Sequence, residues 1–278
     1  MAAPGAEVVI SGVSGRFPEC DSVAEFRDKL FAGEHLVSCD RRRQDLGPSA
    51  ALDTGCSSSL YALEAAVASI AGGRCDAAVV AATNVSLNPL LSTALLGAGA
   101  LTRDGRCKVF DNSADGYTRA EAVVAVLLQR GADARRLYAE VLGTGTNCDG
   151  RTAHSIMFPS AEAQAALMTE TCRRAGVDPL SMGYIEAHGT GTKVGDPQEL
   201  RAIAEAYCGG RSSPLLVGSV KSNMGHAEAA SGLCSLVKVV LAFETGLIPP
   251  NLHFAEPNRG VPQLLDGRIQ VGLVHISP

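Results

Sequence analysis

Cys56 is the residue of this sequence that is best placed to act as a nucleophile. It stands in the run DTGCSSSL, residues 53–60, which follows the apolar residues SAAL and precedes apolar residues at helical spacing. We therefore expect a tight turn at the N-terminus of a helix, where free backbone N–H groups and the helix dipole favour a thiolate over a thiol. The alternative is a small buried hydrophobic residue, the commonest fate of a free cysteine.

Two histidines lie in glycine-containing loops that follow predicted strands. His188 belongs to EAHGTGT, in which the hydroxyls of Thr190 and Thr192 can hydrogen-bond an amide-bearing arm. His226 closes GSVKSNMGH, which also carries Lys221. The chain between the histidines has room for a helix and a strand, so both loops can reach one sheet edge. The alternatives are a structural turn with an incidental histidine and, for Lys221, a solvated side chain.

One thiol and two histidines together suit acyl transfer through a thioester. A Cys–His hydrolase needs one histidine and an orienting Asn or Asp. Two histidines suit a different task, the stabilisation of the enolate oxygen that forms when a carboxylated acyl group loses carbon dioxide. We see no metal-ligand set and no G-x-G-x-x-G loop in the sequence, so we expect neither a metal nor a bound dinucleotide.

Short β-branched runs alternate with longer helical segments, which predicts an α/β protein with a buried sheet. A capping box at Ser22 and Glu25 predicts a helix that stops near Gly33, and Asp196 followed by Pro197 predicts a second capped helix that ends before Gly209. Residues 31–50 show neither the apolar periodicity of a helix nor that of a strand, and they are expected to form a solvated loop. The predicted strands are 7–12, 77–82, 122–128, 139–144, 184–187, 215–219 and 269–276, and the other predicted helices are 57–70, 160–175 and 227–245.

Composition excludes several classes of protein. The 278 residues are 46% hydrophobic and 19% charged, which is typical of a globular chain and excludes global disorder. The net charge of −5 and 4% aromatic content argue against nucleic-acid binding. Nine scattered cysteines without a C-x-x-C pair indicate neither a disulfide framework nor a zinc site. Without a signal peptide or a long apolar run, we expect a cytoplasmic protein that does not enter membranes.

Three motifs resemble the β-ketoacyl synthase domain of animal-type fatty acid synthases, a branch of the thiolase-like superfamily. DTGCSSSL is similar to the active-site cysteine motif, EAHGTGTKVGDPQEL to the first histidine motif and KSNMGHAEAASGL to the motif of the lysine and second histidine. The ending NLHFAEPN with LLDGRIQV looks more like fatty acid synthase than polyketide synthase. The resemblance covers nearly the whole chain.

This resemblance implies an incomplete α/β/α/β/α layered fold and decarboxylative condensation of an acyl-Cys56 thioester with malonyl-carrier protein. His188 and His226 would drive decarboxylation and condensation, and Lys221 would support the second histidine. Thr190 and Thr192 would line the phosphopantetheine channel, with Asn223 as a further substrate contact. No cofactor would be bound directly, because the substrates ride on the phosphopantetheine of acyl carrier protein or on coenzyme A.

Two departures from the family pattern affect what we expect of this chain. A long segment that carries part of the acyl-pocket wall and of the dimer contact is missing near residues 39–49, and the chain stops before the family's glycine- and phenylalanine-rich loop. We divide the chain into an N-terminal half, 1–138, and a C-terminal half, 139–278. The resemblance implies a homodimer, here weakened, and leaves open a catalytically inactive fragment that only interacts with the full-length synthase.

Overall fold

The computed structural model describes residues 22–32, 47–150, 158–272 and 274–275. The chain divides into two compact units, residues 1–48 and 49–278. In the first unit, helix α1 covers Val23–Phe31, and the backbone N–H of Glu25 donates to Ser22 Oγ over 3.2 Å. This bond confirms the predicted N-terminal cap. The predicted strand 7–12, most of the predicted loop 31–50 and the predicted stop at Gly33 lie outside the described residues.

The second unit contains every strand that the structure describes. Its α-helices are α3 (Ser58–Ala71), α4 (Pro89–Gly97), α5 (Ala161–Ala175), α6 (Gly195–Tyr207), α7 (Lys221–Met224), α8 (Ser231–Thr245) and α9 (Pro262–Leu265). Its 3-10 helices are η1 (Gly55–Ser57), η2 (Gly131–Asp133), η3 (Pro179–Ser181) and η4 (Glu228–Ala230). Its strands are β1 (Ala77–Asn84), β2 (Ala122–Gln129), β3 (Tyr184–Glu186), β4 (Leu215–Gly218), β5 (Leu247–Ile248), β6 (Ile269–Val271) and β7 (Val274–His275). None of the described helices has the length and apolarity needed to cross a membrane.

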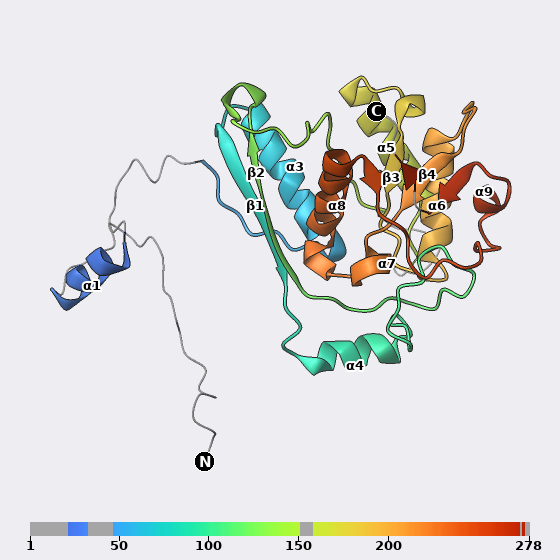
Figure 1. The fold of residues 1–278 in the computed structure, drawn as a ribbon, viewed down its shortest axis with the longest axis horizontal. Helices are drawn as coiled ribbons and strands as arrows, with labels where there is room; N and C mark the ends of the chain where they lie inside the picture. The colour runs from blue at the N-terminus through green and yellow to red at the C-terminus, as the bar shows by residue number, and fades with distance from the viewer. Residues whose placement is uncertain (1–21, 33–46, 151–157, 273, 276–278) are drawn as a thin grey trace, which may run out of the picture. The chain divides into compact units, whose positions relative to one another are not determined.

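A buried parallel sheet, β3–β4–β6, forms one half of this unit (Figure 1). Leu215 and Val217 of β4 are fully buried, and they belong to one apolar core with Leu200 and Ile203 of α6. Because β3 and β4 are parallel, their C-terminal ends open at the same sheet edge, and the loops that follow them carry His188 and His226. The parallel sheet therefore delivers both histidine loops to one place.

An antiparallel pair, β1–β2, forms a second sheet, with α3 and α8 beside it in Figure 1. Val80 of β1 packs with Leu63 of α3 and Leu233 of α8 on its inner face. Its outer face, by contrast, is open to solvent: the cross-strand pair Val79 and Leu127 is 71% and 60% exposed. The prediction of a buried sheet thus holds for β3–β4–β6, whereas no described element of this unit covers the outer face of β1–β2.

Two local predictions are wrong, and a third holds with a change of helix type. Residues 139–144 form no strand: Val141 and Leu142 are 39% and 61% exposed, and no strand among the described residues pairs with this segment. The predicted strand 269–276 is broken by Gly272, whose φ of 142° turns the chain from β6 into β7, a partner of β5 in another sheet. The helix predicted from 227 begins with η4, and its α-helical part starts at Ser231.

Candidate active site

The three predicted reactive side chains, Cys56, His188 and His226, lie together in the structure. The Sγ atom of Cys56 and one ring nitrogen of each histidine all lie within 4.8 Å of one another. The two imidazole rings meet edge to face, with centroids 5.2 Å apart and an interplanar angle of 86°. The loops that follow β3 and β4 and the turn before α3 therefore bring their reactive side chains to a single site.

The turn that carries Cys56 is held by its own polar neighbours. Gly55 has φ +67°, a left-handed conformation that other residues rarely adopt, and its N–H donates to Asp53 Oδ1 over 3.1 Å. Ser58 Oγ donates to Gly55 O over 2.6 Å, and Ser231 Oγ of α8 donates to Cys56 O over 3.2 Å. The glycine and serines of the motif thus place Cys56 on η1, directly before α3.

Two carboxylates hold the loop of His188. Glu199 of α6 accepts the backbone N–H of His188 over 2.6 Å and that of Gly189 over 2.8 Å. Asp196 accepts the N–H of Gly191 over 3.0 Å and that of Phe110 over 2.8 Å. The predicted cap at Asp196 is therefore wrong, because this carboxylate is 1% exposed, with one oxygen bound to the loop at Gly191 and the other to the backbone of Phe110. Burial raises the pKa of Asp196 to about 7, against the opposing effect of these two backbone bonds.

His226 is buried, and its backbone is fixed by the segment that precedes β2. Its N–H donates to Thr118 O over 2.7 Å, and its carbonyl accepts the N–H of Ala120 over 2.9 Å. The ring atom Nδ1 accepts the backbone N–H of Glu228 over 3.2 Å. A neutral imidazole whose Nδ1 accepts a bond carries its proton on Nε2, and Nε2 lies 3.0 Å from Cys56 Sγ. Nε2–H therefore donates toward the sulfur.

Burial lowers the pKa of His226 to about 3, with the Lys221 charge acting in the same direction. Desolvation by the surrounding protein also lowers the pKa of His188, and the Lys221 charge acts in the same direction, although the His188 side chain is exposed. Both histidines are thus neutral near pH 7. Neutral imidazoles can donate a hydrogen bond to a developing oxyanion, which is the task that two histidines were expected to perform.

The pKa of Cys56 corrects one expectation from the sequence. Its location at a helix start predicted a stabilised thiolate, but desolvation raises the pKa of the thiol, and the negative charge of Glu228 raises it further. Lys221 opposes both effects. Cys56 nevertheless stays exposed at the surface of the site. The free site therefore holds a thiol next to neutral imidazoles.

A buried ion pair supports the segment of Lys221, which is itself only 2% exposed. Lys238 Nζ lies 2.7 Å from Glu186 Oε2, and both side chains are 5% exposed. The other oxygen of Glu186 accepts the backbone N–H of Val220 over 2.6 Å, directly before Lys221. Glu186 thus fixes the start of α7 from the end of β3.

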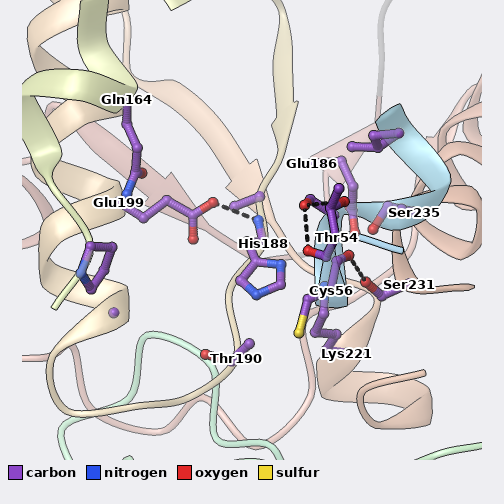
Figure 2. A pocket seen from close by; sticks show the side chains of 16 residues that line it. Thr54, Cys56, Gln164, Glu186, His188, Thr190, Glu199, Lys221, Ser231 and Ser235 are labelled. Carbon is purple, nitrogen blue, oxygen red and sulfur yellow. Dashed lines mark hydrogen bonds between the residues drawn. The ribbon is translucent and has the colours of Figure 1, made fainter. Parts of the chain in front are cut away.

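A cavity of about 510 Å³ opens above Cys56 and His188. Figure 2 shows the Cys56 sulfur and Lys221 on one side of His188 and Glu199 on the other side, joined to the backbone nitrogen of His188 by a dashed line. Thr190 also lines the cavity. The other two predicted substrate contacts do not: the Thr192 hydroxyl accepts the N–H of Gly195 over 3.1 Å, and the Asn223 amide donates to Pro250 O over 3.1 Å.

The same three side chains are of the kinds that ligate zinc. A metal would need a lone pair on His226 Nε2, which requires the proton to move to Nδ1. That position faces the Glu228 N–H donor, so the two hydrogens would oppose each other. The hydrogen-bond pattern therefore favours a donor histidine over a metal ligand.

Several supporting residues were not identified as functional from the sequence. Glu199 lies at the third position after the predicted cap, and its spacing therefore looked like that of an ordinary capping box. Glu186 lies two residues before His188, and Glu228 lies two residues after His226. No local pattern shows which backbone N–H groups or cations these two carboxylates bind. Adjacency to His188 and His226 was the one signal that could have singled them out.

Family models and related proteins agree with this geometry. Residues 44–134 match the model for the β-ketoacyl synthase N-terminal domain, and residues 138–255 match the model for the C-terminal domain. A fatty acid synthase of Anser anser anser is 51% identical over 201 residues, which are 72% of this chain and 57% of that sequence. A highly reducing polyketide synthase of Glarea lozoyensis is 44% identical over 220 residues, which are 78% of this chain and 9% of that one.

Solved ketosynthases share the fold. The oxazolomycin ketosynthase domain KS7 of Streptomyces albus is 39% identical with a TM-score of 0.77, over 84% of this chain and 42% of that one. The ketosynthase from module 6 of the Bacillus subtilis bacillaene synthase is 35% identical with a TM-score of 0.78, over 82% and 42%. The chain thus spans less than half of these solved structures and contains part of their thiolase-like fold. With both domain models matched and the cysteine and two histidines of the motifs assembled, the chain belongs to the β-ketoacyl synthase family.

Proposed function

We propose that the site carries out decarboxylative condensation of a Cys56-bound acyl group with a malonyl thioester, as a 3-oxoacyl-[acyl-carrier-protein] synthase of fatty acid biosynthesis. The observation that carries the proposal is the meeting of the Cys56 sulfur, the His188 ring and the protonated Nε2 of His226 at one cavity. The fatty acid synthase relative, at 51% identity, supports fatty acid over polyketide chemistry.

In the first half of the reaction, Cys56 exchanges its proton for an acyl group taken from a thioester, and the donor thiol leaves. In the second half, the malonyl carboxylate leaves as carbon dioxide, and its bonding electron pair forms an enolate on the remaining thioester. The Nε2–H of His226 and the ring of His188 are placed to stabilise the enolate oxygen. The enolate carbon attacks the acyl carbonyl, the C–S bond to Cys56 breaks, and the sulfur takes up one proton.

The partner that delivers both acyl groups is an acyl carrier protein in this proposal, through its phosphopantetheine arm. Thr190, which lines the cavity, is the threonine placed to contact such an arm. The volume of about 510 Å³ is adequate for a thioester and its neighbouring amide, and it falls within the usual range of ligand pockets.

To test the proposal, the purified chain is supplied with acyl-coenzyme A and malonyl-carrier protein labelled at its free carboxyl group. Release of labelled carbon dioxide and formation of a 3-oxoacyl product are then measured. We expect acylation at Cys56 by mass spectrometry, no product from Cys56→Ala, and a loss of about 100-fold or more from His226→Ala. A soluble, folded chain that takes up no acyl group and releases no carbon dioxide would remove the enzymatic proposal.

A second candidate function is favoured by the open outer face of β1–β2, where Val79 and Leu127 are exposed. In this alternative the chain is inactive and associates through that face with a full-length synthase. Co-purification of the two proteins, lost when Val79 is replaced by lysine and kept in Cys56→Ala, would support it. Turnover by the isolated chain would contradict it.

A further inference from the structure

Arg119 forms a largely buried ion pair with Glu228, two residues after His226. Its Nε and Nη2 atoms donate to Glu228 Oε1 and Oε2 over 2.5 and 3.2 Å, which is a bidentate contact. The two side chains are 9% and 20% exposed, so water competes little for either charge. Glu228 lies within the motif KSNMGHAEAASGL, whereas Arg119 lies outside all three sequence motifs.

The remaining guanidinium nitrogen of Arg119 is also used. Nη1 donates to Ser92 Oγ of α4 over 2.6 Å. The backbone of Arg119 forms a β-bridge with His226, through the bonds of Thr118 and Ala120 described above. Arg119 is therefore fixed at three donor atoms and along its backbone, and it is a rigid support for Glu228.

Glu228 needs such a support because its backbone is unusual. Its φ is +42°, in the left-handed region that residues other than glycine seldom adopt. In this conformation the Glu228 N–H donates to Nδ1 of His226 over 3.2 Å. If Glu228 were unpaired and relaxed to negative φ through a rotation of the peptide that joins residues 227 and 228, its N–H would turn away from Nδ1. The ring would then lose the bond that keeps its proton on Nε2.

We propose that Arg119 is a positioning residue that, by holding Glu228, keeps His226 in the tautomer whose Nε2–H faces Cys56. What that proton does in catalysis rests on the proposed function. The tautomer itself does not, because it exists in the free protein and is measured without turnover.

The experiment is ¹⁵N NMR of the histidine-labelled chain, in which protonated and unprotonated ring nitrogens have distinct shifts. The His226 signals are assigned by their loss in His226→Asn. We expect the wild-type protein to show an unprotonated Nδ1. In Arg119→Met the ratio of the Nε2–H to the Nδ1–H form should fall about two- to tenfold, the range expected for one lost hydrogen bond. Arg119→Lys should restore part of the ratio.

Two matched substitutions at Glu228 separate the backbone from the charge. Both Glu228→Ala and Glu228→Gly remove the carboxylate, but glycine adopts φ +42° without strain. We expect the tautomer ratio to fall in the alanine variant and to be largely kept in the glycine variant. Equal ratios in the two variants would overturn the proposed route through the backbone.

Arg173→Met is the control, because Arg173 makes a similar bidentate contact with Glu170 at the surface, where the side chains are 70% and 49% exposed. It should leave the His226 signals unchanged. A wild-type tautomer ratio in a folded Arg119→Met protein would overturn the proposal. In the condensation assay, kcat should fall in Arg119→Met and recover partly in Arg119→Lys. A wild-type chain without turnover would refute the proposed function, and the NMR result would still decide whether Arg119 positions His226.

Discussion

The protonation state of Cys56 decides how readily the site accepts an acyl group. Desolvation and Glu228 raise the pKa of this thiol, whereas the Lys221 charge and a backbone hydrogen bond lower it. We predict that the alkylation rate of Cys56 with iodoacetamide continues to rise above the usual thiol pKa of about 8.5. Lys221→Met should move the midpoint of this profile to still higher pH. The rates are measured by mass-spectrometric mapping over a pH series.

Cys148 is a suitable internal reference because it is also exposed. Its labelling should be the same in the wild-type and Lys221→Met proteins, whereas buried thiols such as Cys172 and Cys208 should react more slowly than Cys56. A rate for Cys56 that levels off below neutral pH would show a stabilised thiolate, as the sequence alone suggested. Equal labelling of exposed and buried cysteines would mean that the site is not assembled.

His226 should also make the stability of the fold depend on pH. Its pKa is about 3 in the folded chain and about 6.5 in an unfolded one, so between these values the unfolded state binds more protons. The free energy of unfolding therefore rises with pH across this window and is lost as the pH falls from about 6.5 toward 3. At pH 5 the free energy of unfolding is therefore about 2 kcal/mol lower than it is well above pH 6.5, because of His226 alone.

The measurement is urea unfolding at pH 7.5 and pH 5.0 for the wild-type protein and His226→Asn. The asparagine variant should lose about 2 kcal/mol less between the two pH values, because it cannot titrate. His253→Asn, at an exposed histidine, serves as the control substitution. An identical pH dependence in the wild type and His226→Asn would show that His226 is not held neutral.

At the scale of elements, the loop between β3 and α6 is anchored through Asp196. Asparagine has the same shape but offers one acceptor oxygen, so Asp196→Asn should leave the N–H of Gly191 or Phe110 without a partner. We expect a loss of about 1–3 kcal/mol in the free energy of unfolding. Thermal and urea denaturation measure it. Asp266→Asn, at a surface ion pair with Arg268, should change stability by less than Asp196→Asn does.

The elements show what sequence patterns can predict. Helices α3 and α5 and strands β1 and β2 agree with the expected ranges to within a residue or two, because each has clear periodicity or a cap such as Ser160, which accepts the N–H of Ala163. The strand expected at 139–144 failed because β-branched residues form a strand only beside a partner. Helix α4, of mostly apolar and small residues, carries little helical periodicity and was not predicted.

For the site, too, local sequence patterns predict only part of what the structure shows. Motif residues reveal which side chains can react, and the structure brings Cys56, His188 and His226 together. Local pattern does not reveal that Asp196 binds a loop instead of capping its helix, since the same sequence D-P-Q-E serves either purpose. It also cannot place Arg119 against Glu228, because the two residues meet only in the folded chain.

At the scale of the whole molecule, the outer face of β1–β2 should govern association. Val79 and Leu127 face each other across the strands and are exposed, so this face favours contact with other chains. We expect weak self-association that reverses on dilution, together with aggregation at high concentration. The double variant Val79→Lys, Leu127→Glu should reduce both, since opposite charges at paired positions keep the strands together.

Size-exclusion chromatography with light scattering over a dilution series measures this association. Leu142→Lys is the control, because Leu142 is 61% exposed but lies outside the sheet. A dimer that persists at nanomolar concentration in the double variant would contradict the prediction. It would show that another surface carries the association and that the segment expected to be missing near residues 39–49 is dispensable for dimerisation.

The hydrogen bond between Cys56 and His226 joins residues 170 positions apart in the chain. During synthesis at about 5–20 residues per second, the thiol emerges on the order of ten to thirty seconds before its partner histidine. Throughout that interval Cys56 is an ordinary cysteine on an unfinished fold, without the imidazoles or the lysine that define the site. Cys56 therefore leaves the ribosome before His188, Lys221 and His226 do. During that interval its thiol is accessible to oxidants and chaperones without the rest of the site around it.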